Sequence, residues 1–280
     1  MSTGFVTSDG RTLAYTRSGS GRLLVCHSGG PGFSGATLGD LGGLAGECEL
    51  VIIDPRGTGR SDRPASGDGY RFDDYLADPE ELRQHLGREE IDLLGHSHGG
   101  FVAMSYAAAH PERVRRLVLA STAPRFAQEY TDAINAVWDA SPDPRVAEGR
   151  RAREQRQSGA VRDADEFARL AMLELTLFVA DPDRAGQVGA LFQQPPNLDA
   201  LAYFNSAIAP RYDLRPQLGA LRAPTLVITG DHDFFGRPAA DEIVARIPDA
   251  RLVVLDRAGH FAWVDAPERF REEVARFLTA

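Results

Sequence analysis

The 280-residue sequence contains no lysine, so all 31 of its basic residues are arginine. Without lysine the chain cannot form a Schiff base with pyridoxal phosphate or with a carbonyl substrate. It also cannot carry the G-x-x-x-x-G-K-[ST] loop that binds nucleotide phosphates. The sequence has only two cysteines, Cys26 and Cys48, too few for a disulfide framework and without a C-x-x-C pair for zinc or redox chemistry. We expect both to be small buried residues.

Long hydrophobic runs and a basic leader are missing as well. The segment Met1–Phe5 has neither a basic nor an apolar targeting region, and no apolar run approaches the ~18 residues of a membrane span. The formal charge of −9 argues against nucleic acid or an anionic membrane as a partner. We therefore expect a cytoplasmic protein that acts on a small molecule or short peptide, with its oligomeric state left open.

The pattern of apolar runs predicts an α/β protein. A hairpin is expected around Asp9-Gly10, between strands at 5–7 and 12–15. Short apolar strands then alternate with helical patterns such as 74–86, which is typical of a mostly parallel central sheet flanked by helices. These strands are expected at 23–26, 50–53, 91–94, 114–119, 225–229 and 252–255.

The alternation stops after Pro124 and resumes at Pro224. Helical stretches are expected in between, at 132–138, 145–157, 165–179, 182–191 and 198–207. We therefore predict a core formed by residues 1–123 and 218–280, with a helical cap, residues 124–217, inserted before the last two core strands. Such a cap would cover the site and select the substrate. The arginine-rich stretch from Arg145 to Arg156 is interleaved with glutamate, which predicts a solvated helix face.

The candidate nucleophile is Ser97, in the pentapeptide Gly95-His96-Ser97-His98-Gly99. A G-x-S-x-G turn between a strand and a helix forces the serine into a strained conformation that exposes its hydroxyl, and the glycines let neighbouring chain pass. His96 and His98 flank the serine, but alternate residues of a turn point apart and no further ligand completes a metal set. We expect no metal. The Gly57-Thr58-Gly59 turn lacks the third glycine of a dinucleotide loop, so we also expect no cofactor.

A base and an acid follow the last two predicted strands. Asp231 and Asp233 come directly after 225–229, and His260 comes after 252–255. The carboxyl ends of parallel strands meet at one edge of the sheet, so these loops can converge on Ser97. The chain order Ser, Asp, His is that of an α/β-hydrolase. We predict His260 as the base, whereas the spacing alone leaves the choice of acid open, since one aspartate could cap the turn that follows.

A glycine loop, Ser28-Gly29-Gly30-Pro31-Gly32, follows the strand at 23–26. Tight glycine turns expose backbone N–H groups. One such group, together with the N–H of His98 next to the nucleophile, would form an oxyanion hole for a tetrahedral intermediate.

Taken together, these motifs resemble the α/β-hydrolase superfamily and, within it, the proline iminopeptidase (prolyl aminopeptidase) group marked by H-G-G-P-G. The resemblance covers nearly the whole chain and includes the stretch Asp54-Pro55-Arg56-Gly57. It implies that Asp233 is the acid and that Gly30 provides the loop donor. Ser28 stands where the family usually has histidine, with His27 one place earlier, so Gly29 remains the alternative donor. The elbow has His98 where typical proline iminopeptidases carry tryptophan.

The resemblance implies a cofactor-free serine hydrolase that works through an acyl-enzyme and removes an N-terminal aminoacyl group from a small substrate. Proline iminopeptidases hold the substrate's amino group with acidic residues. Glu174 is our candidate for this, since at helical spacing it shares an apolar face with Leu170 and Phe178. The alternative is an ion pair with a nearby arginine such as Arg169 or Arg211. Alternative functions are an esterase, lactonase or thioesterase, or a non-catalytic ligand-binding receptor on the same fold.

Overall fold

The computed structural model describes residues 2–158, 161 and 163–280. Its strands follow the predicted apolar runs closely. They are β1 (Ser2–Val6), β2 (Thr12–Ser18), β3 (Leu23–His27), β4 (Glu49–Ile53), β5 (Ile91–His96), β6 (Val114–Ala120), β7 (Thr225–Gly230) and β8 (Ala250–Leu255). The predicted hairpin is confirmed, because β1 and β2 pair antiparallel on either side of Gly10, which has a φ of 83°.

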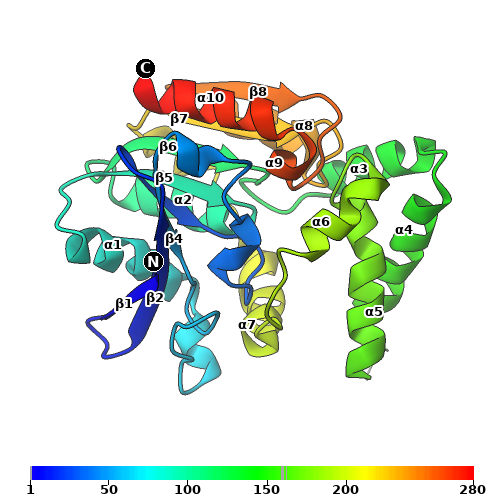
Figure 1. Cartoon of the computed structure of the whole chain (residues 1–280), viewed down its shortest axis with the longest axis horizontal. Helices are drawn as coiled ribbons and strands as arrows, with labels where there is room; N and C mark the ends of the chain where they lie inside the picture. Colours follow the sequence, from blue (N-terminus) through cyan, green and yellow to red (C-terminus); the bar gives the residue numbers. More distant parts are fainter. Residues whose placement is uncertain (1, 159–160, 162) are drawn as a thin grey trace.

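Within the described residues the strands form one sheet of eight, in the order β1-β2-β4-β3-β5-β6-β7-β8 (Figure 1). The strands from β4 to β8 in this order run parallel, β2 pairs antiparallel with β4, and β1 pairs antiparallel with β2. The expected mostly parallel sheet is therefore confirmed. β3 pairs with β5, and β7 pairs with β8, so the loops that follow each pair are neighbours at the carboxyl edge.

Helices cover both faces of this sheet, which explains why its strands are continuous apolar runs. The core helices are α1 (Phe72–His85), α2 (His98–Ala109), α8 (Gly236–Val244), α9 (Ala262–Asp265) and α10 (Pro267–Thr279). Residues of α1, α2 and α8 pack on one face together with Val25, whereas residues of α9 and α10 pack on the other with Leu24 and Cys26. Cys26 and Cys48 are buried and free, as expected.

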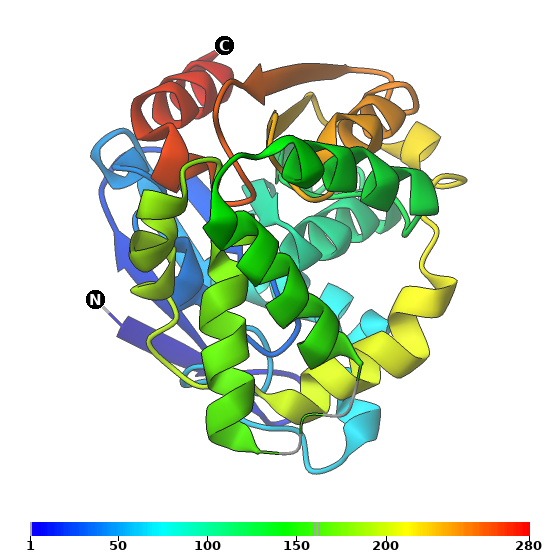
Figure 2. The same cartoon turned by 90° about the vertical axis from the view of Figure 1, so that its right-hand side faces the viewer.

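The chain between β6 and β7 is helical, and no strand occurs among its described residues apart from an isolated bridge between Arg125 and Asp213. Figure 2 faces this region, in which α4 and α5 cross in front of the sheet. Its helices are α3 (Gln128–Ala140), α4 (Pro144–Gln157), α5 (Ala164–Glu174), α6 (Ala185–Gly189) and α7 (Leu198–Tyr203).

The helix expected over 165–179 is shorter than predicted. It ends at Glu174 and continues as a 3-10 turn, Leu175–Leu177, so Phe178 does not share a helical face with Leu170 and Glu174. Phe178 instead contacts the core, since its C=O accepts a hydrogen bond of 3.3 Å from the N–H of Phe261. The stretches at 182–191 and 198–207 likewise contain only the short helices α6 and α7 with adjoining turns.

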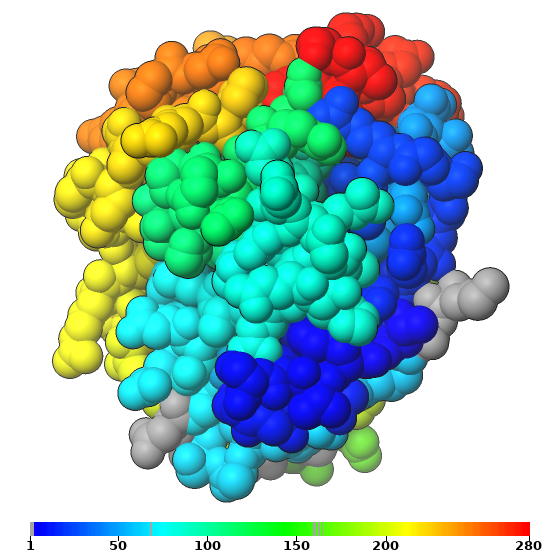
Figure 3. All heavy atoms as spheres, turned by 90° about the vertical axis from the view of Figure 1, so that its left-hand side faces the viewer, coloured from blue at the N-terminus to red at the C-terminus, as the bar shows by residue number. Residues whose placement is uncertain are grey.

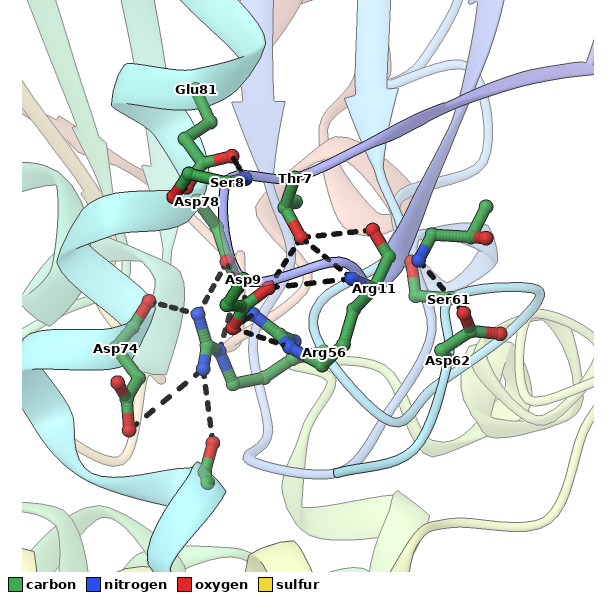
Figure 4. Close-up of polar contacts among 12 residues, drawn as sticks. Thr7, Ser8, Asp9, Arg11, Arg56, Ser61, Asp62, Asp74, Asp78 and Glu81 are labelled. Atoms are coloured by element: carbon green, nitrogen blue, oxygen red, sulfur yellow. Dashed lines mark hydrogen bonds and ion pairs between the residues drawn. The ribbon is translucent and has the colours of Figure 1, made fainter. Parts of the chain in front are cut away.

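The loop after β4 is fixed by the buried side chain of Arg56 (Figure 4). Its guanidinium donates to the Asp78 carboxylate on α1 and to the C=O groups of Gly69 and Asp74. The side chains of Arg56 and Asp78 are 2% and 1% exposed, so this ion pair is a buried one that fastens the loop to α1. Figure 3 shows the outer side of this region, where the hairpin β1–β2, in dark blue, lies against the segment around α1, in cyan.

No helix in the described part of the chain combines the length and the apolar character needed to cross a membrane.

Candidate active site

Ser97 occupies the turn between β5 and α2 with φ of 53° and ψ of −119°. A non-glycine residue rarely adopts positive φ, and the strain persists only where the surroundings enforce it. Here the Ser97 N–H donates to Ala120 (3.0 Å), and its C=O accepts from the hydroxyl of Thr122 (2.8 Å). A Cβ atom on Gly99 would overlap the backbone of His27, which explains the glycine. The geometry is that of a nucleophile elbow.

The structure brings together His260 and Asp233. Nδ1 of His260 lies 2.9 Å from Oδ1 of Asp233, and both side chains are buried. The carboxylate also accepts from the Thr229 hydroxyl (2.7 Å) and from the N–H of Phe235 (3.1 Å). An ionised carboxylate only accepts, so Nδ1 of His260 carries the proton and Nε2 is left as a base.

The charge of the Asp233 carboxylate is well supported. Burial raises the pKa of this group, but the charge of His260 and the hydrogen bonds from His260 and Thr229 outweigh that effect and hold the pKa below its ordinary value of 3.8. Asp233 therefore stays ionised at neutral pH.

Asp231 does not contact His260. Its Oδ1 accepts from the N–H of Ala258 (3.1 Å) and lies 2.7 Å from Nδ1 of His232. Its side chain is 37% exposed, in contrast to the fully buried Asp233. Of the two aspartates that the sequence left open, the structure places only Asp233 against the histidine.

His96 links His260 to the elbow, a role that the sequence did not suggest. Nε2 of His96 donates to the C=O of His260 (3.0 Å), and the two rings lie 4.6 Å apart. His96 directly precedes Ser97, so these contacts hold the loop that carries His260 against the elbow. Within the described residues Ser97 Oγ itself makes no hydrogen bond. Catalytic hydrogen bonds often form only in the complex with substrate.

The side chains of His96 and His98 point to opposite sides of the elbow. His96 packs on Trp263 (4.7 Å between ring centres), whereas His98 packs on Tyr75 (5.2 Å) and Phe204 (5.0 Å). Burial lowers the pKa of both imidazoles well below 6.5. A search of the described residues finds no group of three or more His, Cys, Asp or Glu side chains that could hold a metal ion.

The glycine loop after β3 lies against the elbow. A Cβ atom on Gly29 would be 2.7 Å from Cβ of Ser97, whereas one on Gly30, which has a φ of 72°, would meet the ring of Phe33. The N–H of His98 belongs to the first turn of α2, where amides have no acceptor within the helix. Gly29 thus makes the closer approach to Ser97, and both glycines remain candidates for the second donor.

Asn197 connects the cap to this loop. Its N–H donates to the C=O of Gly32 (2.7 Å), and its side-chain amide donates to the C=O of Gly57 (2.9 Å). Its Oδ1 also accepts from the first amides of α7. The sequence analysis missed Asn197. Its only signal is an asparagine directly before a helical stretch, which predicts an N-cap but not the contact with the loop.

Glu174 lies at the end of α5 and is 2% exposed. Its Oε2 accepts from Nε and Nη2 of Arg156 (2.7 and 2.6 Å), and its Oε1 lies 3.3 Å from Nη1 of Arg153. The alternative of an ion pair with an arginine is confirmed, but the partners are not Arg169 or Arg211, because α4 packs along α5 and presents its own arginines. For the same reason the predicted solvated face of α4 does not include Arg153 and Arg156.

The chain was compared with known proteins. A model of the α/β hydrolase fold family matches residues 22–267. The chain belongs to the α/β-hydrolase family. It is 22% identical to a proline iminopeptidase of Heyndrickxia coagulans over 99% of this chain and 98% of the relative. It is 31% identical to a 2-hydroxymuconate semialdehyde hydrolase of a Pseudomonas species, over 93% and 88%.

Among solved structures, an esterase from Exiguobacterium antarcticum superposes with a TM-score of 0.76 at 22% identity, over 100% of both chains. This likeness supports the α/β-hydrolase fold expected from the sequence. The relatives of this α/β-hydrolase include peptidases and other hydrolases at low identity. The three proteins named here are all hydrolases, whereas their substrates differ.

Proposed function

We propose that this α/β-hydrolase is a cofactor-free serine hydrolase that works through an acyl-enzyme. The observation that carries the proposal is the buried Asp233–His260 pair beside the strained turn of Ser97. Ser97 Oγ attacks the carbonyl carbon while Nε2 of His260 takes its proton and passes it to the leaving group. Water then attacks the acyl-enzyme by the same route. Asp233 holds the imidazole in the required tautomer and stabilises its charged form.

The oxyanion of each tetrahedral intermediate would be held by backbone N–H groups. The candidates are His98 at the start of α2 and Gly30 in the loop, with Gly29 as the alternative. Removing one donor of this kind typically costs about 3 kcal/mol of transition-state stabilisation. Asn197 supports the arrangement by fastening the cap to the loop that carries these donors.

For the substrate, the likeness to proline iminopeptidases favours an N-terminal aminoacyl amide. That activity needs negative charge beside the substrate ammonium, and Glu174 was the candidate for it. The structure speaks against this role, since Arg153 and Arg156 already neutralise the carboxylate. An ester, lactone or thioester with a neutral or anionic acyl group is therefore the second candidate, and the Glu174 contacts favour it.

A labelling experiment tests the proposal. A fluorophosphonate should modify the wild-type protein covalently and leave Ser97→Ala unmodified. A panel of prolyl and alanyl anilides beside p-nitrophenyl esters then separates the two substrate classes. Turnover by Ser97→Ala above about 1% of wild type would reject Ser97 as the nucleophile, because loss of a triad member normally costs several orders of magnitude. A folded wild type that is neither labelled nor active would support the receptor alternative.

A further inference from the structure

A cavity of about 560 Å³ lies between the cap and the loop after β7. Helices α3 and α4, both visible in Figure 2, form its cap side, and Phe234 and Phe235 form its core side. The volume is within the range of small-molecule sites, about 300–1,000 Å³. Half of its lining residues are aromatic or aliphatic, including Tyr130, Ile134 and Trp138 from α3, and the other half are polar or charged.

The cavity adjoins the proposed catalytic pair. The ring of Phe234 lines the cavity and lies 3.9 Å, centre to centre, from the ring of His260. Phe235, also in the lining, donates its N–H to Asp233. A molecule in the cavity would thus be separated from the base by a single aromatic ring.

Arg153 lies on the aromatic side of this cavity. The guanidinium carbon of Arg153 lies 5.6 Å from the ring centres of both Trp138 and Phe234. A guanidinium has five N–H donors. Within the described residues Arg153 makes one hydrogen bond, the 3.3 Å contact with Glu174, so its other donors are available to a ligand.

The carboxylate nearest to Arg153 is shared with a second arginine. Glu174 supplies one negative charge to two guanidinium groups, and Arg156 makes the shorter contacts with it. The other charged residues that line the cavity are Arg150, which is paired with Asp139, and the exposed Glu154. Burial lowers the pKa of Arg153, yet a guanidinium remains charged at neutral pH.

We propose that this cavity binds the carboxylate of an amphiphilic organic acid, with Arg153 on the carboxylate and the rings of Trp138 and Phe234 against the apolar body. A planar guanidinium held between two rings suits bidentate recognition of a carboxylate. The inference rests on the proposed function in one respect, because it takes the bound acid to be part of the substrate or product of the reaction at Ser97. It assigns to the cap a preference for anionic over cationic groups.

Calorimetry on the Ser97→Ala protein tests the binding without any need for turnover. The probe is 3-phenylpropanoate, and its neutral analogue 3-phenylpropanamide is the reference. The carboxylate should bind about 10–100-fold more tightly than the amide, as expected for a charge-assisted hydrogen bond. In Ser97→Ala combined with Arg153→Gln, this ratio should fall to nearly one.

Arg150→Gln is the matched control, because Arg150 lines the same cavity but is already paired with Asp139. It should keep the preference for the carboxylate. Arg153→Lys, which retains the charge and loses the planar fork, serves as a second variant should Arg153→Gln unfold, and it should show an intermediate ratio. Equal binding of the two probes to the Ser97→Ala protein would overturn the inference, as would an unchanged ratio in Arg153→Gln or a loss in Arg150→Gln. Labelling of the wild type by fluorophosphonate tests the proposed function separately.

Discussion

Replacing Asp233 by asparagine is the sharpest test of the proposed catalytic group. Oδ1 of Asp233 receives two N–H donors, from His260 and Phe235, whereas Oδ2 accepts from the rotatable hydroxyl of Thr229. An asparagine would therefore place its oxygen toward His260 and its NH₂ toward Thr229. The imidazole keeps its tautomer in that arrangement, and what is lost is the negative charge that stabilises the imidazolium in the transition state.

The size of the loss follows from burial. Asp233 and His260 are 0% and 3% exposed, so the imidazolium that forms during the reaction would be a buried charge without a partner. Breaking a buried ion pair costs about 3–5 kcal/mol, which corresponds to roughly 10²–10⁴ in kcat. If the asparagine instead turned its NH₂ toward His260, the wrong tautomer would form and the loss would be at the upper end of that range.

Asp231→Asn is the matched control, two residues away and without contact to His260. Steady-state kinetics on an activated ester would measure both variants, with active sites counted by fluorophosphonate and folding checked by thermal unfolding. We expect Asp231→Asn to lose less than about fivefold, because it gives up only a partly exposed contact with His232 and the Ala258 amide. Larger damage from Asp231→Asn than from Asp233→Asn would refute the assignment.

Three further predictions concern stability and acid response. In thermal or urea unfolding, the free energy of unfolding of Ser97→Gly should be about 1 kcal/mol higher than that of Ser97→Ala, because glycine adopts the positive φ without strain. Both variants should be inactive. Glu174→Gln should lower the free energy of unfolding by about 2 kcal/mol, less than for a fully buried pair because its arginines are partly exposed. Glu174→Gln should also lower the turnover of aminoacyl anilides and of esters by the same factor. A loss of turnover confined to the anilides would support a role of Glu174 in binding the substrate ammonium. Burial lowers the pKa of His27 from 6.5 to about 4. Between these two values the unfolded chain binds a proton at His27 and the folded chain does not, so the free energy of unfolding should fall as the pH drops from 6.5 toward 4. His27 alone contributes about 3 kcal/mol to this loss; urea unfolding at pH 7, 6 and 5 should show a shallower decline for His27→Asn than for the wild type.

The strands and the candidate triad could be predicted from sequence because each depends on a local pattern. Parallel strands buried on both faces appear as short apolar runs, and each run found in the sequence became a strand. The elbow is also local, since its glycines are required by backbone overlap within a few residues of Ser97 and by the nearby loop after β3. The loops after β7 and β8 were predicted to converge on the elbow because the carboxyl ends of parallel strands lie at one edge of the sheet.

Other features depend on contacts between distant segments and left no such pattern. Phe178, which lies beyond the end of α5, makes a backbone hydrogen bond with Phe261 of a distant segment. The partners of Glu174, Arg153 and Arg156, lie on α4, a separate helix that precedes α5 in the chain. Helical spacing within α5 could therefore not identify them. His96 and Asn197 act through backbone groups of remote loops, which have no side-chain signature.

The residues that support the reaction and those that would select the substrate lie in different parts of the molecule. The motifs shared with proline iminopeptidases lie in the core, around Ser97, Asp233 and His260, and they serve acyl transfer from any carbonyl compound. The charge that would select a substrate lies on α4 and α5 of the cap, where two arginines meet one glutamate beside an aromatic cavity. A substrate ammonium placed there would face Arg153 rather than a free carboxylate. The core residues therefore support acyl transfer as the reaction. The charges on the cap favour a substrate whose acyl group or leaving group carries no positive charge.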